Sequence, residues 1–227
     1  GNDRLDGGEG ADTMVGGDGH DTYYVDDSGD QTNEAANQGA DTVFASVSYS
    51  IATSHIETLI LTGSGDLNGT GNALVNSLVG TSGNNRLDGG GGVDTLAGGL
   101  GDDTYYVENV RDTVIERRNE GMDTVFAAVS FALGGSHVET LTLTGGAHIN
   151  ATGNSLDNVL NGNSGNNILY GGVGADTMTG GAGNDTYSVD NSGDVVHEWA
   201  DGGVDIVLST VSFWLDAYTE NLTLNGT

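Results

Sequence analysis

The chain has 227 residues, no cysteine, no proline and a formal net charge of −28, from 33 acidic and 5 basic residues. The lack of cysteine excludes disulfide bonds, thiol catalysis and thiolate metal sites, and the negative charge argues against nucleic-acid binding, which requires a basic surface. No apolar stretch approaches the length of about 18 residues that a membrane span needs, and no signal peptide is visible.

The chain opens with a nine-residue repeat of the form G-G-x-G-x-D-x-U-x, in which U is a large apolar residue. Two full copies occupy residues 7–24, and two more occupy each of residues 89–106 and 171–188. Three glycines within four residues permit a tight turn and leave carbonyl oxygens unshielded, and an aspartate follows at once. The end of the first copy, Thr13 to Val15, predicts a very short strand with Met14 turned into a core. Turns alternating with parallel strands predict a solenoid.

Two ladders of residues keep step with this nine-residue period. Position six is an aspartate or asparagine at Asp3, Asp12, Asp21, Asp30, Asn76, Asn85, Asp94, Asp103, Asp112, Asn158, Asn167, Asp176, Asp185 and Asp194. A large apolar residue follows two positions later at Leu5, Met14, Tyr23, Leu78, Leu87, Leu96, Tyr105, Leu160, Leu169, Met178 and Tyr187. The first ladder predicts a row of polar ligands, and the second predicts the core.

After each block of nonapeptides comes a less regular arm that is rich in β-forming residues. In the first arm the β-rich runs are residues 41–49 (DTVFASVSY) and 57–62 (ETLILT), and both other arms carry similar runs. Alternating apolar and small polar residues predict half-buried strands. The best helical candidate, NEAANQ at residues 33–38, is too short to be stable alone.

The chain also repeats on a longer scale, since the opening GNDRLD returns as GNNRLD at residues 83–88. We expect repeat units at 1–82, 83–164 and 165–227 in one continuous solenoid, the third unit being incomplete. Seven acids of the first unit have acidic counterparts in both others: Asp12, Asp21, Asp26, Asp30, Glu34, Asp41 and Glu57. Asp26, Glu34 and Asp41 are either further ligands or a solvated face. Because the chain begins in mid-repeat without methionine, we expect it to be an excerpt of a longer protein.

The density of carboxylate and carbonyl oxygens indicates calcium, which takes six to eight oxygen ligands at about 2.3–2.6 Å. One turn cannot supply so many oxygens, so neighbouring turns must share an ion. A chain with a net charge of −28 repels itself when compact unless counter-ions bind. Folding is therefore expected to be linked to calcium binding.

In these motifs the chain resembles the RTX, or haemolysin-type calcium-binding repeat, proteins of Gram-negative bacteria. The resemblance implies an all-β, right-handed parallel β-roll in which each of several Ca²⁺ ions lies between one nonapeptide and the next but one. The implied ligand pairs are Asp3 with Asp21, Asp12 with Asp30, Asp94 with Asp112, Asp176 with Asp194, Asn85 with Asp103, and Asn167 with Asp185. Carbonyl groups of Gly8, Gly10, Gly90, Gly92, Gly172 and Gly174 are implied to contribute.

The sequence departs from the family pattern where asparagine replaces the position-six aspartate. A neutral amide oxygen attracts a cation less than a carboxylate does, so the sites at Asn85 and Asn167 are expected to be weaker. The weakest expected pairs are Asn76 with Asp94 and Asn158 with Asp176.

The resemblance also implies type I secretion of an unfolded chain that folds outside the cell in millimolar calcium. We expect a non-catalytic module of a larger secreted or cell-surface protein, acting as a structural spacer or surface-layer element. No G-x-S-x-G or H-E-x-x-H motif is present, and the H-x-E triplets at His55 and His137 lack the cysteines of zinc deaminases.

The alternative is a carbohydrate-binding or adhesive module attached to a secreted enzyme or adhesin, with polysaccharide or cell-surface components as partners. Coaxial self-association is also open, because the two ends of a solenoid expose unpaired strand edges. Ice binding through outward threonine pairs is disfavoured, since two consecutive threonines per unit make too short a flat ladder.

Overall fold

The computed structural model describes residues 1–225, and every regular element in that range is a β-strand. Contacts divide the chain into two compact units, unit 1 (Gly1–Gly121) and unit 2 (Met122–Thr227). The hexapeptide at residues 33–38 ends one short strand and continues into turns, so the prediction of an all-β chain is confirmed. Residues 1–225 contain no helix that is long and apolar enough to cross a membrane.

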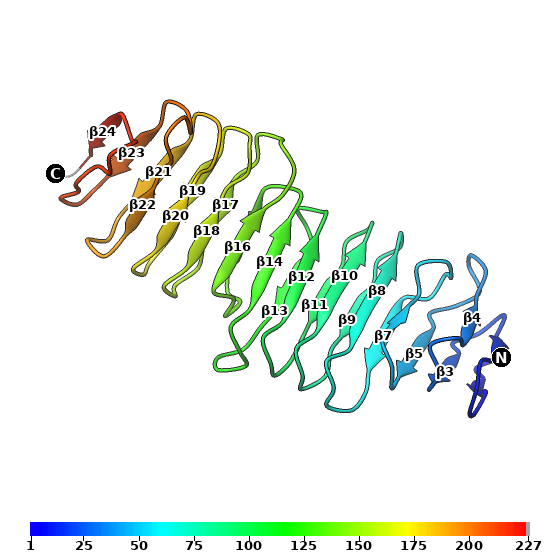
Figure 1. Cartoon of the computed structure of the whole chain (residues 1–227). Helices are drawn as coiled ribbons and strands as arrows, with labels where there is room; N and C mark the ends of the chain where they lie inside the picture. Colours follow the sequence, from blue (N-terminus) through cyan, green and yellow to red (C-terminus); the bar gives the residue numbers. More distant parts are fainter. Residues whose placement is uncertain (226–227) are drawn as a thin grey trace. The chain divides into compact units, whose positions relative to one another are not determined.

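Unit 1 consists of short parallel strands joined by turns. They are β1 (Arg4–Asp6), β2 (Thr13–Val15), β3 (Thr22–Val25), β4 (Gln31–Asn33), β5 (Thr42–Ala45), β6 (Tyr49–Ser50), β7 (Thr58–Leu61), β8 (Asn68–Asn72), β9 (Ser77–Val79), β10 (Arg86–Gly90), β11 (Thr95–Ala97), β12 (Thr104–Val107) and β13 (Thr113–Ile115). One sheet has the order β1-β3-β5-β7-β9-β11-β13, a second includes β6-β8-β10-β12, and β2 pairs with β4. Each of these sheets is a wall of a β-solenoid, and the strands of the first wall stack from blue to green in Figure 1.

Unit 2 is built in the same way. Its strands are β14 (Thr124–Ala127), β15 (Phe131–Ala132), β16 (Thr140–Leu143), β17 (Ala151–Thr152), β18 (Val159–Asn161), β19 (Ile168–Tyr170), β20 (Thr177–Thr179), β21 (Thr186–Val189), β22 (Val195–His197), β23 (Ile206–Ser209) and β24 (Asn221–Leu224). Their parallel pairing gives the orders β14-β16-β18-β20-β22 and β15-β17-β19-β21-β23-β24.

The length of a turn differs between the nonapeptides and the arms. Leu5 pairs with Tyr23, the equivalent residue of the next nonapeptide but one, as two nonapeptides per turn require. In the first arm, Tyr23 pairs with Val43, Val43 with Leu59, and Leu59 with Leu78. The first and third of these turns are longer than a pair of nonapeptides, and the second is shorter. The arm therefore continues the parallel ladder and changes only the length of the turns.

The apolar ladder forms the core, as predicted. Met14 is 5% exposed, Leu5 at the start of the stack is half-buried, and the other members of the ladder are at most 1% exposed. Three-residue strands such as β2 and β20 bury their central residue and turn the flanking residues outward, because successive side chains of a strand point to opposite faces. Full burial of one such leucine contributes about 1.5–3 kcal/mol, so the stack rests on many equivalent small contributions.

Candidate calcium sites

The glycines predicted as carbonyl ligands lie in backbone conformations that favour glycine. The φ angles of Gly8, Gly10, Gly90, Gly92, Gly172 and Gly174 lie between 78° and 151°. At Gly90 a side chain would also meet the carbonyl oxygen of Asn72 in the preceding turn, 2.5 Å from the position of an added Cβ. The turns are therefore formed as the motif predicts, and the role of their carbonyl groups as ligands stays a prediction.

The structure brings together the members of every predicted pair. In each pair the backbone N–H of the first residue donates a hydrogen bond to Oδ1 of the second. The N···O distances are 2.6 Å for Asp3–Asp21, 2.9 Å for Asp12–Asp30, 2.6 Å for Asn85–Asp103, 2.9 Å for Asp94–Asp112, 2.7 Å for Asn167–Asp185 and 3.0 Å for Asp176–Asp194. The two weakest expected pairs, Asn76–Asp94 and Asn158–Asp176, have the same bond at 2.7 and 2.8 Å.

The second carboxylate oxygen of several ladder aspartates is buried without a hydrogen-bond donor. This holds, within residues 1–225, for Oδ2 of Asp12, Asp21, Asp94, Asp176 and Asp185, each with less than 1 Å² of accessible area. A buried carboxylate oxygen without a donor costs several kcal/mol unless a cation or proton neutralises it. The residues present therefore fit the calcium that the motif implies.

Burial also changes the proton affinity of these groups. Desolvation raises the pKa of Asp94 to about 6, although the hydrogen bond from the backbone of Asn76 acts in the opposite direction. It likewise raises the pKa of Asp185 to about 6, against the hydrogen bond from Asn167. The arginine ion pairs of the described chain join Arg4 to Asp6, Arg86 to Asp88 and Arg117 to Glu120, and none of these acids belongs to the ladder.

The last aspartate of each block differs from those before it, because loop N–H groups donate to its Oδ2. Asp30 accepts from Asp26 and Asp27, at 3.2 and 3.3 Å. Asp112 and Asp194 accept equivalent bonds from the loops before them. These aspartates stabilise the turn that closes the block. If they also bind calcium, their Oδ2 atoms must do so while accepting these loop hydrogen bonds.

The position-six asparagines have partners on both sides of the amide. Asn85 Oδ1 accepts from the backbone N–H of Thr81 at 2.6 Å, and its Nδ2 donates to the carbonyl of Leu67 at 2.9 Å. Asn167 repeats this arrangement in unit 2, where Nδ2 donates to the carbonyl of Ile149 at 2.6 Å. The amide hydrogens thus lie against carbonyl oxygens of the preceding turn, and the assignment of Asn85 and Asn167 as ligands stays a prediction.

Acids in the arms extend the ladder beyond the nonapeptides. The N–H of Asp21 donates to Asp41 Oδ1 at 2.8 Å, and the N–H of Asp41 donates to Glu57 Oε2 at 2.9 Å. Asp185, Asp205 and Glu220 repeat this chain of bonds at 2.7 and 2.9 Å. The sequence leaves Asp41 open as a further ligand because it has acidic counterparts in the other repeat units, and Glu57, which is not assigned as a ligand, carries the same signal.

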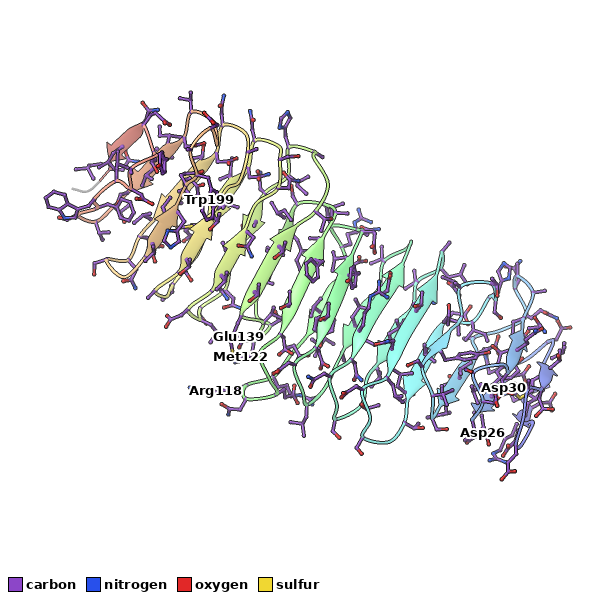
Figure 2. The ribbon with its side chains drawn as sticks, in the orientation of Figure 1. Asp26, Asp30, Arg118, Met122, Glu139 and Trp199 are labelled. Carbon is purple, nitrogen blue, oxygen red and sulfur yellow. The ribbon has the colours of Figure 1, made fainter. Side chains whose placement is uncertain are left out.

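Glu34 and Asp26, the other uncertain acids, lie in different environments. Glu34 is 7% exposed and lies beside Asp21 and Asp41. Asp26 is exposed, although it belongs to the same turn as the buried Asp30 (Figure 2). The structure therefore supports the solvated-face interpretation for Asp26 alone.

Comparison with known proteins agrees with this arrangement. The family model for the RTX calcium-binding nonapeptide repeat, in four copies, matches residues 1–31, 70–105 and 152–187. The chain therefore carries RTX calcium-binding nonapeptide repeats in these three segments.

One curated protein is similar in sequence to part of the chain. Over 85 residues the chain is 38% identical to endo-1,3-1,4-beta-glycanase ExsH of Rhizobium meliloti (strain 1021). The match covers 37% of this chain and 18% of the glycanase, so the similarity concerns less than a fifth of that relative's length.

Proposed function

We propose that the chain is a non-catalytic, calcium-binding module of a larger secreted protein, which folds on binding calcium outside the cell and acts as a structural spacer or surface-layer element. The observation that carries this proposal is the row of buried Oδ2 atoms without donors, represented by Asp12, Asp94 and Asp176. Their burial makes the compact state unfavourable until the carboxylates are neutralised.

The residues that would hold calcium are the ladder aspartates together with carbonyl groups of the glycine turns. When bound, calcium supplies positive charge that neutralises carboxylates of successive turns. The chain's own part is to hold Oδ1 of a ladder aspartate on an N–H of the preceding turn while its Oδ2 stays buried without a donor. This is so at Asp21, Asp94, Asp176 and Asp185. Low calcium would leave the carboxylates mutually repelling and the chain unfolded, whereas extracellular calcium modules typically bind at about 10⁻⁴–10⁻³ M. A chain with such an affinity would stay unfolded in the low calcium of the cell and fold in the millimolar calcium outside, which supports secretion in the unfolded state.

Calorimetric calcium titration of a ladder variant tests this proposal. The triple variant Asp12→Asn, Asp94→Asn, Asp176→Asn should bind fewer calcium ions than the parent chain and need more calcium to fold. The control triple Glu9→Gln, Asp18→Asn, Asp201→Asn removes the same charge from positions outside the ladder and should leave the number of ions unchanged. Equal ion counts in the ladder variant and the control would contradict the proposal.

A second candidate function is carbohydrate binding beside a secreted enzyme. Two observations favour it: the similarity to a glycanase, and a groove of about 440 Å³ in unit 2 lined by His197, Phe213, Trp214 and Asp216, among others. Trp214 is 91% exposed, and its counterparts in the other repeats are Ser50 and Ala132. An exposed indole beside polar groups can stack on a sugar ring while its neighbours bond the hydroxyl groups.

Tryptophan fluorescence titrated with a soluble mixed-linkage β-glucan tests this second candidate. A saturable change that is lost in Trp214→Ala, with the fold intact by circular dichroism, would support it. An unchanged spectrum at millimolar glucan would exclude the groove as a glucan site and leave the spacer function as the sole proposal.

A further inference from the structure

Each unit contains a cluster of three buried carboxylates at the junction between nonapeptides and arm. In unit 1 these are Asp21, Glu34 and Asp41, and in unit 2 they are Asp185, Glu198 and Asp205, with one oxygen of each residue within 4.8 Å of the others. All six residues are at most 7% exposed. We refer to the two clusters as the junction triads.

One oxygen of each acid in unit 1 is held by a hydrogen bond. Asp21 Oδ1 accepts from Asp3 N–H at 2.6 Å, and Asp41 Oδ1 accepts from Asp21 N–H at 2.8 Å. Glu34 Oε1 accepts from Gly17 N–H at 3.1 Å and from the hydroxyl of Tyr23. In unit 2 the hydroxyl of Tyr187 donates to Glu198 in the same way.

The other oxygens of the triads are buried without donors, except Glu198 Oε2, which accepts from the backbone N–H of Trp199 at 3.3 Å. In the part of the chain that the structure describes, Oδ2 of Asp21 and Asp41 and Oε2 of Glu34 have less than 1 Å² of accessible area and no hydrogen-bond partner. The same is true of Oδ2 of Asp185 and Asp205. Three carboxylates so close together cannot all stay ionised in a buried place without a counter-charge.

The triad of unit 1 lies directly against the backbone of a glycine. Glu34 stands one turn of the solenoid after Gly16, where the nonapeptide places its first glycine. A Cβ added to Gly16 would lie 2.5 Å from the hydroxyl oxygen of Tyr23 and 2.6 Å from Glu34 Oε1, and it would also clash with Asp21 Oδ2. The glycine therefore allows oxygens of Asp21, Tyr23 and Glu34 to approach the backbone closely.

We propose that the junction triads are calcium sites of a second kind, in which a glutamate side chain joins the two aspartates of successive turns. This inference rests on the proposed calcium-binding function and adds a distinct class of site to it. Affinity for hard cations rises with the number of charged ligands, so the three carboxylates make each triad a tighter site than a ladder pair flanked by an asparagine. The triads are then the first sites to fill as calcium rises.

Calcium calorimetry of the full chain tests the proposal with the double variant Glu34→Gln, Glu198→Gln. The expected result is the loss of two ions from the tightest class of sites. The control, Glu9→Gln with Asp201→Asn, removes the same charge from exposed positions and should keep the parent's binding curve.

Two outcomes would overturn the proposal. One is a double variant that binds as many ions as the control, at the same calcium concentration. The other is a double variant that folds at lower calcium than the parent, which would show that the charge of the two glutamates opposes folding and does not bind calcium. A parent chain that binds no calcium would instead refute the proposed function itself.

A measurement on the parent chain keeps the proposal testable if the double variant does not fold. Terbium(III) replaces calcium at oxygen sites and emits when a nearby tyrosine is excited. Because Tyr23 and Tyr187 bond directly to the triads, tyrosine-sensitised emission should rise with the first ions added. Emission that appears only after the other sites are filled would contradict the assignment.

Discussion

Asparagine and aspartate at position six of the nonapeptide differ in whether all polar atoms of the side chain find hydrogen-bond partners within the chain. Asn85 uses its amide hydrogens to bind the carbonyl of Leu67, 2.9 Å away, and its Oδ1 accepts from Thr81. Asp94, at the same position of the next nonapeptide, leaves Oδ2 buried without a donor in the described residues. An asparagine turn therefore needs no counter-ion, whereas an aspartate turn needs a cation or a proton.

The variant Asn85→Asp tests this difference. At a calcium concentration just sufficient to fold the parent chain, a carboxylate facing the Leu67 carbonyl should lower the free energy of unfolding by about 1–3 kcal/mol, because two acceptors then face each other. At high calcium the loss should be recovered, since the carboxylate gains a counter-ion. Urea unfolding at two calcium concentrations measures both values.

The matched control is Asn84→Asp, which adds the same charge at the exposed neighbouring position. Its Oδ1 accepts from Asp102 N–H at 2.9 Å, a bond that a carboxylate preserves. If Asn85→Asp were equally destabilised at both calcium concentrations, the new carboxylate would not be acting as a ligand.

Glycine at the first position of the nonapeptide is needed for space. The variant Gly16→Ala should lower the free energy of unfolding in saturating calcium by about 1–3 kcal/mol, because its Cβ would press against Tyr23 and Glu34. Gly65→Ala is the control, since the nearest atom to its Cβ would be 3.8 Å away. Urea unfolding compares the two, and equal stability of both variants would show that the oxygens beside Gly16 can move apart.

At the scale of strands and turns, the nonapeptides were predictable and the arms only in part. The period places Leu87 and Leu96 in the core and pairs Asp94 with Asp112, all of which the structure reproduces. The unequal turns of the first arm were not predictable, because the arm lacks the glycine spacing that marks each turn. The long turn between Tyr23 and Val43 instead contains Asn37 at a φ of 66°, a conformation that asparagine tolerates better than most residues.

The contacts of the candidate sites were the least predictable part. Periodicity shows which acids share a row, but the partners of Glu34 come from turns that differ in length. The hydrogen bond from Tyr23 to Glu34 depends on that stacking. The division into three repeat units stays a prediction about how the sequence is organised.

The buried carboxylates of the turns predict an unusual pH dependence. Burial raises the pKa of Asp94 and Asp185 to about 6 and that of Glu198 to about 7. The folded chain thus binds protons more tightly than the unfolded chain, whose carboxyl groups have pKa values of about 4. This stabilisation is fully present below about pH 4 and is lost as the pH rises through 6 to 7.

In chelator, we therefore expect acidification from neutral pH to increase β-structure in far-UV circular dichroism. The variant Asp94→Asn, Asp185→Asn should show a smaller change between pH 4 and 7, which separates these groups from the general loss of negative charge. A calcium-free chain that loses β-structure on acidification would contradict the environment described for these aspartates.

At the scale of the whole molecule, charge decides when the chain can be compact. With 33 acidic and 5 basic residues, its own cations can neutralise only a small share of its carboxylates. The core is a row of apolar side chains, one or two from most of the short strands, and each packs only against those of neighbouring turns. Rows of buried carboxylates run beside it. The hydrophobic energy of this core is therefore opposed by the repulsion between turns until calcium binds.

The most direct test of this account is a calcium titration of the chain, starting in excess chelator and followed by far-UV circular dichroism. The account predicts an unfolded chain in chelator at neutral pH and a cooperative rise of β-structure on calcium addition, with several ions bound at the end point. A chain that already shows the full β-spectrum in chelator, and does not change on calcium addition, would contradict the coupling of folding to calcium.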